Sequence, residues 1–251
     1  MNIVLIGAGN VATHLGCALK EKGFSIAQVY SRTLASAQNL GEKLQTAYTE
    51  EIAEIIPNAD VYLFSVKDSV LEDIIRQISK NHGLWIHTAG SISIDVFSGY
   101  TDRYGVLYPL QTFSKNRKIT FDNIPLFIET HFPEDEKILS EIASQLSGTV
   151  VPLSSEKRKQ LHLAAVFACN FTNHLYTLSA QILEKQDLPW NYLIPLIEET
   201  ALKIKTLHPK EAQTGPAVRN DTNVMNKQLD LLADDAKMQQ IYRILSESIS
   251  R

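Results

Sequence analysis

Residues 3–11, Ile-Val-Leu-Ile-Gly-Ala-Gly-Asn-Val, place an apolar strand pattern directly before a glycine turn near the start of the chain. An amphipathic helix is predicted to follow over residues 10–22. In this order, a strand, a turn and a helix can hold a dinucleotide pyrophosphate on backbone N–H groups. Gly7 permits the turn, Gly9 lets phosphate approach, and Ala12 allows close packing of helix and sheet. The expected phosphate-binding residues are Gly7, Ala8, Gly9, Asn10 and Val11; a plain strand-to-helix turn is the alternative.

The end of the predicted second strand, residues 27–30, indicates which dinucleotide the turn would bind. An NAD-binding chain usually carries Asp or Glu here, about 20 residues past the glycines, for the ribose hydroxyls. This chain has Ser31-Arg32-Thr33 instead. A guanidinium can pair with a 2′-phosphate, which a carboxylate would repel, and the two hydroxyls can donate hydrogen bonds. The sequence therefore favours NADP over NAD, with a helix N-cap beside a solvated arginine as the alternative interpretation.

Composition and charge exclude several classes of protein. The chain has 251 residues, of which 44% are hydrophobic and 21% charged, which is typical of a globular protein. A formal net charge of -4 gives no electrostatic footprint for nucleic acid. Cys17 and Cys169 lie within apolar helical patterns, so neither a disulfide framework nor a metal cluster is expected. Because no leader sequence and no membrane-spanning apolar run is visible, we expect a cytoplasmic protein with no membrane partner.

Strand and helix patterns alternate over the first part of the chain. Apolar runs at residues 59–66 and 84–87 are typical of strands buried on both faces, and residues 35–44 have a helical pattern. Further strands are predicted at residues 105–108, 125–128 and 149–152, with one helix beginning at Ser69 and another over residues 134–146. This alternation predicts an α/β domain over residues 1–153, with the doubly wound parallel sheet of a Rossmann fold.

From residue 154 the strand patterns disappear, which predicts a second, all-α domain over residues 154–251. Helical patterns cover residues 156–185, 191–206 and 223–250, the last with a break near Ala233. Residues 161–183 are almost entirely apolar, so they do not form a surface helix with a single apolar stripe. That helix must be buried either centrally or between subunits, and a homodimer formed through the helical domain is the favoured assembly.

Ligands of an open parallel sheet bind beyond the carboxyl ends of its strands, so the residues that end or follow each strand are candidates for the site. Ser65 and Val66 end one predicted strand, and Thr88-Ala89-Gly90 follows another. Small residues there suit close approach by a cofactor, and equally a tight bend. His87 could face the nicotinamide ribose or the substrate, or could close its strand as a hydrogen-bonded structural histidine.

The long apolar helix carries an imidazole and amides. At about 100° per residue, His162, Cys169 and Asn173 project within about 20° of one another, and Asn170 lies about 80° round from His162. An imidazole near neutral pH can exchange the proton that accompanies hydride transfer, and an amide can polarise a carbonyl or imine. We therefore predict His162 and Asn170 as catalytic residues, with satisfied polar groups in a helical interface as the alternative.

Residues 214–221, Thr-Gly-Pro-Ala-Val-Arg-Asn-Asp, form a turn-rich loop between predicted helices. Arg219 can hold a carboxylate or a phosphate as a bidentate fork, which favours an anionic small-molecule substrate. Asp221 either orients that arginine or caps the helix that begins near Thr222. We include Arg219 with His162 and His87 among the predicted catalytic residues, and we predict no metal site.

Together these stretches resemble a bacterial Rossmann-like family with a C-terminal helical domain of unknown function. Its members are provisionally described as NADP oxidoreductases, or as similar to F420-dependent NADP oxidoreductases. The resemblance extends over essentially the whole chain and is carried by residues 7–12, 30–33, 87–90, 107–113, 161–166, Asn170 and 214–221. The first half also resembles pyrroline-5-carboxylate reductase, ketopantoate reductase and the 6-phosphogluconate and 3-hydroxyisobutyrate dehydrogenases. This implies a helical domain like that of 6-phosphogluconate dehydrogenase, NADP(H) as cofactor, and hydride transfer at the cleft between domains.

One departure from the resemblance keeps two functions open. Hydroxyacid dehydrogenases of this kind carry a Lys followed four residues later by Asn on the first long helix, whereas Lys159 is followed at that spacing by Leu163. The favoured hypothesis is an enzyme, an NADP-dependent oxidoreductase that acts on a small carbonyl, imine or hydroxy compound. The alternative is a non-catalytic NADP(H)-sensing protein that signals through its helical domain, and F420 is a further candidate cofactor.

Overall fold

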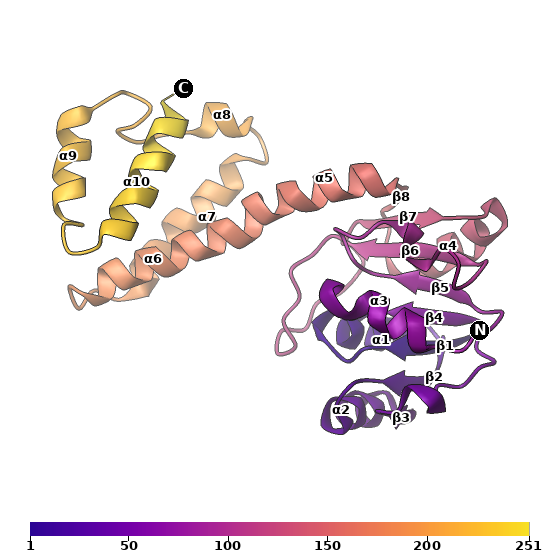
Figure 1. The fold of residues 1–251 in the computed structure, drawn as a ribbon. Coiled ribbons are helices and arrows are strands. Elements are labelled where there is room, and N and C mark those ends of the chain that lie inside the picture. The colour runs from indigo at the N-terminus through magenta and orange to yellow at the C-terminus, as the bar shows by residue number, and fades with distance from the viewer. Residues whose placement is uncertain (251) are drawn as a thin grey trace. The chain divides into compact units, whose positions relative to one another are not determined.

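The computed structural model describes residues 1–250, which form two compact units (Figure 1). The first unit spans Met1–Asn170, and the second begins at Phe171. All strands of the described chain lie within residues 2–152, and the elements that follow are helical. The domain boundary predicted after residue 153 coincides with this change of secondary structure and, as a functional boundary, stays a prediction.

The first unit is built on an eight-stranded sheet in the order β3-β2-β1-β4-β5-β6-β7-β8. β1 to β6 are parallel, and the chain passes from β3 back to β4 on the other side of β1, which makes β1 and β4 the switch point of a doubly wound sheet. The predicted α/β fold class is therefore confirmed. The strands are β1 (Asn2–Ile6), β2 (Ser25–Tyr30), β3 (Ala47–Thr49), β4 (Val61–Phe64), β5 (Leu84–His87), β6 (Tyr104–Pro109), β7 (Leu126–Thr130) and β8 (Val150–Pro152).

The last two strands differ from the predicted parallel arrangement. β7 runs antiparallel to β6, with Tyr108 opposite Phe127, and β8 runs parallel to β7. β7 is antiparallel because residues 110–125, which connect it to β6, form no helix that could carry the chain back across the sheet. The helix that follows β8, α5 (Ser155–Ala165), therefore begins near the amino end of β6 and passes towards the carboxyl end of that strand.

Helices cover both faces of this sheet. On one face, α1 (Asn10–Glu21), α2 (Leu34–Leu44) and α4 (Pro133–Leu146) contribute to a core of mostly aliphatic side chains. On the other face, α3 (Asp68–Gln77) and the 3-10 turns η1 (Ile52–Glu54) and η2 (Ile94–Phe97) lie over an aromatic core. In that core the rings of Phe64 and Phe97 both pack against Trp85. Burial on both faces explains why the strands are apolar at nearly every position.

Close packing of α1 on the sheet depends on a glycine that the fingerprint does not include. Ala12 is fully buried, and Gly16, one turn later, faces Leu5 and Leu44. A Cβ atom on Gly16 would lie 2.6 Å from a methyl carbon of Leu5 and 3.0 Å from one of Leu44. Glycine inside a helix costs about 1 kcal/mol relative to alanine. Here it allows the helix to approach β1 and α2 more closely than alanine would.

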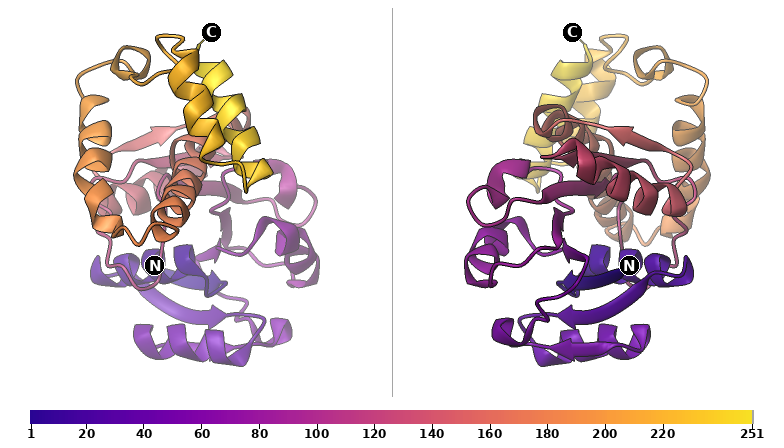
Figure 2. Two further views of the ribbon diagram at one scale, coloured as in Figure 1. Left: turned by 90° about the vertical axis from the view of Figure 1, so that its left-hand side faces the viewer. Right: turned by 90° about the vertical axis from the view of Figure 1, so that its right-hand side faces the viewer.

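The second unit is helical over its described length. α9 and α10 lie side by side (Figure 2), and Gln239 and Tyr242 of α10 donate hydrogen bonds to Leu229 and Gln228 of α9. The break predicted near Ala233 is the turn between these two helices. The elements are α6 (Thr172–Glu184), the 3-10 turn η4 (Trp190–Leu193), α7 (Ile194–Lys203), α8 (Pro209–Ala212), α9 (Thr222–Asp230) and α10 (Ala236–Ile249).

The long apolar helix carries exposed apolar side chains. α5 continues through a π-helical segment, η3 (Val166–Phe171), into α6. Leu163, Phe167 and Leu175 along this path are 52%, 62% and 37% exposed. These side chains are not buried within their own units, and burial of the helix centrally or between subunits stays a prediction. Across residues 1–250, none of the helices combines the length and the apolar character that a membrane span requires.

Candidate functional site

The turn between β1 and α1 has the geometry of a phosphate cradle. Gly7 has a φ of 116°, and a Cβ atom there would lie 2.4 Å from the carbonyl oxygen of Ser65. Only glycine fits, because an L side chain is strained at this φ and would meet backbone. At Gly9, the N-cap of α1, an added Cβ would have that same oxygen as its nearest neighbour, 3.9 Å away. The space beside Gly9 is thus open to a phosphate, while Ala8 is buried and Val11 half-buried.

The first helical side chain of α1 is engaged by a loop. Asn10 Nδ2 donates a hydrogen bond to the carbonyl oxygen of Phe113 over 2.8 Å, and His14 Nε2 lies 2.9 Å from the carbonyl oxygen of Ser114. These contacts tie the segment after β6 to α1. The first turn of α1 has no acidic residue and no side-chain cap. Its backbone N–H groups, rather than the Asn10 amide, are therefore the donors available to an anion.

The predicted 2′-phosphate site lies between β2 and α2. Arg32 and Thr33 are exposed, Ser31 is half-buried, and Thr33 is the N-cap of α2. The Thr33 hydroxyl donates to Ser36 Oγ over 2.9 Å and does not cap the helix itself. The N–H of Leu34 instead donates to a carboxylate oxygen of Glu50 over 2.9 Å. The helix N-terminus that the alternative interpretation requires, an N-cap beside a solvated arginine, is present. The Glu50 carboxylate binds at this N-terminus.

The residues that end β4 and β5 lie next to one another at the carboxyl edge of the sheet. Thr88 Oγ1 donates a hydrogen bond to Ser65 Oγ over 3.2 Å. Both side chains are buried, as is Gly90, whereas Val66 and Ala89 are half-buried. Because the Ser65 carbonyl also faces Gly7, the predicted cofactor residues after β1, β4 and β5 belong to one continuous edge.

His87 closes β5 as a buried, neutral imidazole. Its side chain is 0% exposed, its Nδ1 accepts a hydrogen bond from the Ala89 N–H over 3.2 Å, and its ring contacts Phe97. Burial, assisted by the positive charge of Arg158, lowers the pKa of His87 to about 3. Such an imidazole holds the turn after β5 and does not exchange protons with a ligand near neutral pH. Of the two interpretations of His87, the geometry favours the structural one.

His162 reaches the same edge from α5. Its Nδ1 lies 2.9 Å from the hydroxyl oxygen of Tyr108, at the carboxyl end of β6, and the two rings are inclined at 79°. Gly90 makes room for the imidazole, since a Cβ atom there would lie 2.6 Å from both Cγ and Nδ1 of His162. Burial raises the pKa of Tyr108 by more than the positive charge of Arg158 lowers it. Two predicted residues, His162 and Gly90, therefore meet a tyrosine that was not among the predicted site residues.

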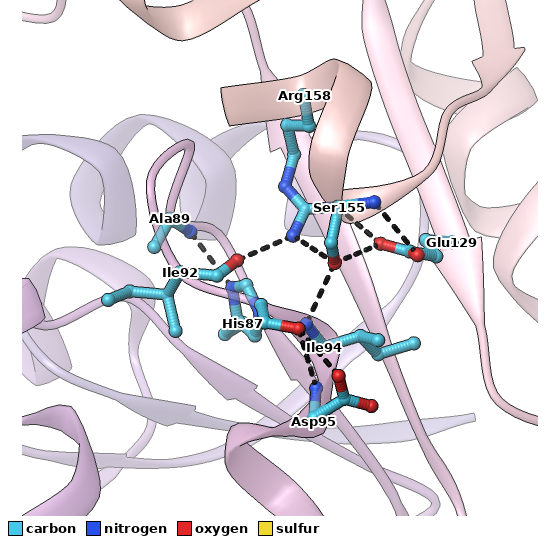
Figure 3. A network of polar contacts seen from close by, with 9 residues as sticks. His87, Ala89, Ile92, Ile94, Asp95, Glu129, Ser155 and Arg158 are labelled. Atoms are coloured by element: carbon cyan, nitrogen blue, oxygen red, sulfur yellow. Dashed lines mark hydrogen bonds and ion pairs between the residues drawn. The ribbon is translucent and has the colours of Figure 1, made fainter. Parts of the chain in front are cut away.

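A buried ion pair anchors α5 one turn before His162 (Figure 3). Arg158 is 0% exposed, and its guanidinium pairs with the Glu129 carboxylate of β7 at 2.5 Å. The same guanidinium donates to the carbonyl oxygen of Ile92 over 2.6 Å and to Ser155 Oγ over 3.0 Å, and Ser155 donates in turn to Glu129. A buried charge is tolerated when it is paired and hydrogen-bonded. This network therefore fixes the position of α5 on the sheet.

Asn170 and Arg219 are exposed. Asn170 lies in η3, and a π turn holds more residues than an α turn. The angles predicted between His162 and Asn170, Cys169 or Asn173 are therefore wrong, because they assumed an unbroken α-helix. Arg219 lies in the second unit, before α9, where Asp221 Oδ1 accepts from the Val224 N–H over 3.2 Å. The capping role for Asp221 is confirmed, and the catalytic roles of Asn170 and Arg219 stay predictions.

Sequence patterns missed Tyr108 and Arg158. Tyr108 has the appearance of a core residue within a strand, and Arg158 lies in a basic run, residues 157–159, that is typical of a solvated face. Two signals were available, because Tyr108 ends a predicted strand and Arg158 precedes His162 by four residues on one helix. Neither signal identifies Glu129 as the partner of Arg158.

Two family models match successive parts of the chain. Residues 2–95 match a family described as NADP oxidoreductase, coenzyme F420-dependent. Residues 124–249 match a family described as a domain of unknown function, DUF2520. The predicted family resemblance is therefore confirmed. No protein with a curated description matches the chain.

Solved structures resemble the chain over nearly its whole length. A protein of Bacteroides fragilis, provisionally described as an NADP oxidoreductase, is 52% identical with a TM-score of 0.94, over 99% of this chain and 97% of its own. An imine reductase from Myxococcus stipitatus in complex with NADP+ is 16% identical with a TM-score of 0.68, over 100% of this chain and 92% of its own. A 1-pyrroline-5-carboxylate reductase from Streptococcus pyogenes is 15% identical with a TM-score of 0.64, over 100% and 98%. The two distant structures show the fold alone.

Proposed function

The chain belongs to the family that joins an NADP oxidoreductase domain to a C-terminal DUF2520 domain, and we propose that it transfers hydride between NADP(H) and a small carbonyl, imine or hydroxy compound. One observation carries this proposal. The open cradle at Gly9 and the His162–Tyr108 pair belong to the same carboxyl edge of one sheet. A place for a dinucleotide and a group able to exchange a proton are what such a reaction requires.

When bound, NADPH supplies a hydride from its nicotinamide ring, and the residues present fit this cofactor. The open space beside Gly9 suits a pyrophosphate, and the exposed guanidinium of Arg32 suits a 2′-phosphate. We assign the pyrophosphate to Gly7, Ala8, Gly9, Asn10 and Val11, the 2′-phosphate to Ser31, Arg32 and Thr33, and the rest of the dinucleotide to Ser65, Val66, Thr88, Ala89 and Gly90.

We assign the proton to His162. Its ring is half-buried, its Nδ1 is held by Tyr108, and no hydrogen bond described within residues 1–250 uses its Nε2. That nitrogen is the one free to meet a substrate. We do not assign proton exchange to His87, because its pKa of about 3 keeps it neutral and its side chain is fully buried. Asn170 and Arg219 remain candidates for polarising the substrate and binding its anionic group.

We further propose that the helical unit forms a homodimer. Tyr192, Leu196 and Leu231 of this unit are 67%, 63% and 82% exposed. Apolar surface on this scale in one compact unit is typical of an interface between subunits. A second copy of the chain is the occupant that closed symmetry favours.

The enzymatic proposal is tested by following NADPH absorbance with a panel of 2-keto acids, ketones and cyclic imines. We expect the wild type to consume NADPH with at least one class, and His162→Ala to lower kcat by roughly 100-fold through loss of proton transfer. His174→Ala, which removes an exposed histidine of α6, is the matched control and should leave kcat unchanged. NADPH binding without consumption across the panel would reject catalysis and support the NADP(H)-sensing alternative.

The assignment of the 2′-phosphate is tested by titrating Arg32→Glu with NADPH and NADH. Loss of a charged hydrogen bond of about 1.5–3 kcal/mol should reduce the preference for NADPH by roughly 10- to 100-fold. Lys80→Glu introduces the same charge change at another exposed position and should leave the preference unchanged. An unaltered preference in Arg32→Glu would reject this assignment, and a parallel titration with F420 tests the further cofactor.

A further inference from the structure

The contact between Tyr108 and His162 joins strand β6 to helix α5 through one hydrogen bond. Tyr108 Oη and His162 Nδ1 are 2.9 Å apart, within the range of a hydrogen bond in either direction. The neutral imidazole carries one hydrogen, on Nδ1 or on Nε2, and which nitrogen carries it follows from the direction of this bond. The direction therefore decides whether Nε2 donates or accepts a hydrogen bond at the edge of the sheet.

The imidazole is confined by Tyr108, by the backbone at Gly90 and by the anchored helix that carries it. Tyr108 meets it edge to face, with ring centroids 5.8 Å apart. The backbone at Gly90 lies so close that a Cβ atom there would be 2.6 Å from Nδ1. One turn earlier, Arg158 ties α5 to Glu129 and to the Ile92 carbonyl. In this confined position the ring presents Nδ1, rather than Nε2, to Tyr108.

Burial of the tyrosine favours one direction of the bond. Tyr108 is 7% exposed, and burial raises its pKa, so the hydroxyl keeps its proton. A buried O–H group without an acceptor is costly. His162 Nδ1 is the hydrogen-bond partner that the described residues provide for this hydroxyl. If Nδ1 instead carried the hydrogen, both groups would present hydrogens to each other unless the hydroxyl turned towards another acceptor.

We infer that Tyr108 is a positioning residue that donates its hydroxyl hydrogen to His162 Nδ1 and thereby holds the hydrogen of the neutral imidazole on Nε2. The inference rests on the proposed function in one respect, the role of His162 towards a substrate. A hydrogen on Nε2 makes that nitrogen a donor. The substrate group that it meets is then an acceptor, the oxygen of a carbonyl or the nitrogen of an imine, rather than an alcohol or amine that must lose a proton. The Nε2–H group then donates a hydrogen bond that polarises this acceptor for hydride addition. As its proton passes to the reduced substrate, Nδ1 takes the Tyr108 hydroxyl proton, which solvent replaces.

The direction of the bond is measured by nuclear magnetic resonance of protein labelled with 15N-histidine, at a pH high enough to keep the imidazole neutral. Loss of one signal set in His162→Gln assigns the ring. We expect Nε2 of His162 to show the chemical shift and one-bond proton coupling of an N–H nitrogen, and Nδ1 to show neither. In Tyr108→Phe, which keeps the packed ring, we expect the two nitrogens to shift towards an average of the two tautomers.

Tyr104→Phe is the matched control, because Tyr104 is a buried tyrosine on the same strand whose ring stacks on His131. It should leave the His162 signals unchanged. A hydrogen on Nδ1 in the wild type, or a Tyr108→Phe spectrum identical to the wild type, would overturn the inference.

Kinetics separate failure of this inference from failure of the proposed function. With a substrate in hand, Tyr108→Phe should lower kcat by about tenfold or more while leaving the KM for NADPH unchanged, because misplacing the hydrogen removes the correct tautomer. An unchanged kcat would overturn the functional part of the inference. If the spectrum shows the expected tautomer but no substrate is reduced, the proposed function fails and the assignment of the tautomer stands.

Discussion

The two units of this chain differ in how completely they bury their apolar side chains. In the sheet unit, apolar residues form two buried cores, and even Arg158 is fully buried with its charge paired. In the helical unit the buried hydrophobic residues are Ala217, Leu229, Leu232 and Met238, whereas Tyr192, Leu196 and Leu231 stay largely exposed. The first unit completes its own core, and the second leaves apolar surface uncovered.

Contacts within one chain therefore bear on function mainly in the sheet unit. In the sheet unit, strand order and paired charges determine which side chains meet. The contact of His162 with Tyr108 can therefore be used directly to propose a function. In the helical unit the exposed apolar residues are the surface that the proposed dimer would cover. The two tryptophans allow the units to be followed separately, because Trp85 lies in β5 and Trp190 in the second unit. A Trp190→Phe background therefore reports on the sheet unit alone.

The largest expected effect comes from breaking the network that anchors α5. In the Trp190→Phe background, Arg158→Met should lower the free energy of unfolding by about 3–5 kcal/mol, because the Glu129 carboxylate loses its buried partner. Urea unfolding followed by Trp85 fluorescence measures this change. Lys159→Met, at the exposed neighbouring position, should change the free energy by less than about 0.5 kcal/mol. Equal effects of the two substitutions would show that the ion pair does not set the stability of the sheet unit.

The next effect separates folding from cofactor binding within the cradle. Gly7→Ala should destabilise the sheet unit by about 1–3 kcal/mol, because its Cβ would meet the Ser65 carbonyl at 2.4 Å and its φ of 116° is strained for alanine. Gly9→Ala meets no atom closer than 3.9 Å, so it should unfold like the wild type while weakening NADPH binding by about tenfold or more. Urea unfolding and fluorescence titration with NADPH give the two quantities. A stable Gly7→Ala protein, or tight NADPH binding by Gly9→Ala, would contradict the cradle geometry.

Buried His87 predicts an acid sensitivity of the sheet unit. Its pKa in the folded state is about 3, below the ordinary value of 6.5, so between these values the unfolded chain binds a proton that the native chain does not. The contribution of His87 to the free energy of unfolding is therefore full above pH 6.5, its ordinary pKa, and decreases as the pH falls towards about 3, its pKa in the folded state. Between about pH 7.5 and pH 5 this histidine should account for a loss of about 2 kcal/mol.

That contribution is isolated by comparing urea unfolding at the two pH values for the wild type and His87→Gln. The loss of stability should be smaller in His87→Gln, which has no imidazole to protonate. His82→Gln, which removes an exposed histidine, should retain the pH dependence of the wild type. If His87→Gln also retained it, the burial of a neutral His87 would not be the cause.

The smallest effect on the free energy of unfolding is expected for a substitution on the exposed apolar surface of the helical unit. That substitution should instead change the oligomeric state. Leu196→Arg should alter the free energy of unfolding by less than about 0.5 kcal/mol, because Leu196 is 63% exposed in the single chain. If the apolar surface joins two copies, the same substitution should convert a dimer into a monomer in sedimentation velocity. Glu199→Arg, at an exposed charged position of α7, is the control and should leave the dimer intact. A wild-type chain that sediments as a monomer would reject the homodimer.

Regular, local patterns made most of the fold predictable. The alternation of strands and helices up to residue 153, the helices after it and the break near Ala233 follow from hydrophobic period and turn residues. The three-residue strand β3 and the 3-10 turn η2 were missed, because such short elements have no period. The antiparallel direction of β7 was also missed. The direction of a strand depends on whether the preceding connection crosses the sheet. No local pattern in residues 110–125 indicates this.

The candidate site was predictable only in part. Residues after strands were expected to share an edge, and Ser65, Thr88 and Gly90 do so because parallel strands end on the same side. The angles between His162 and Asn170 were wrong, because the π segment η3 interrupts the α-helix. Tyr108 was missed because its partner lies 54 residues away in the sequence.

Local sequence patterns were enough to predict the strand, glycine turn and helix of residues 3–21, the order of the elements and the NADP oxidoreductase family, because these depend on local chemistry. The different roles of two histidines follow instead from long-range packing, which buries a neutral His87 and holds His162 against Tyr108 and Gly90. That packing depends on the position of α5, which is set by a buried ion pair between residues 29 positions apart. The energy of such a pair comes from burial and from contact in three dimensions, and neither leaves a periodic trace in the sequence.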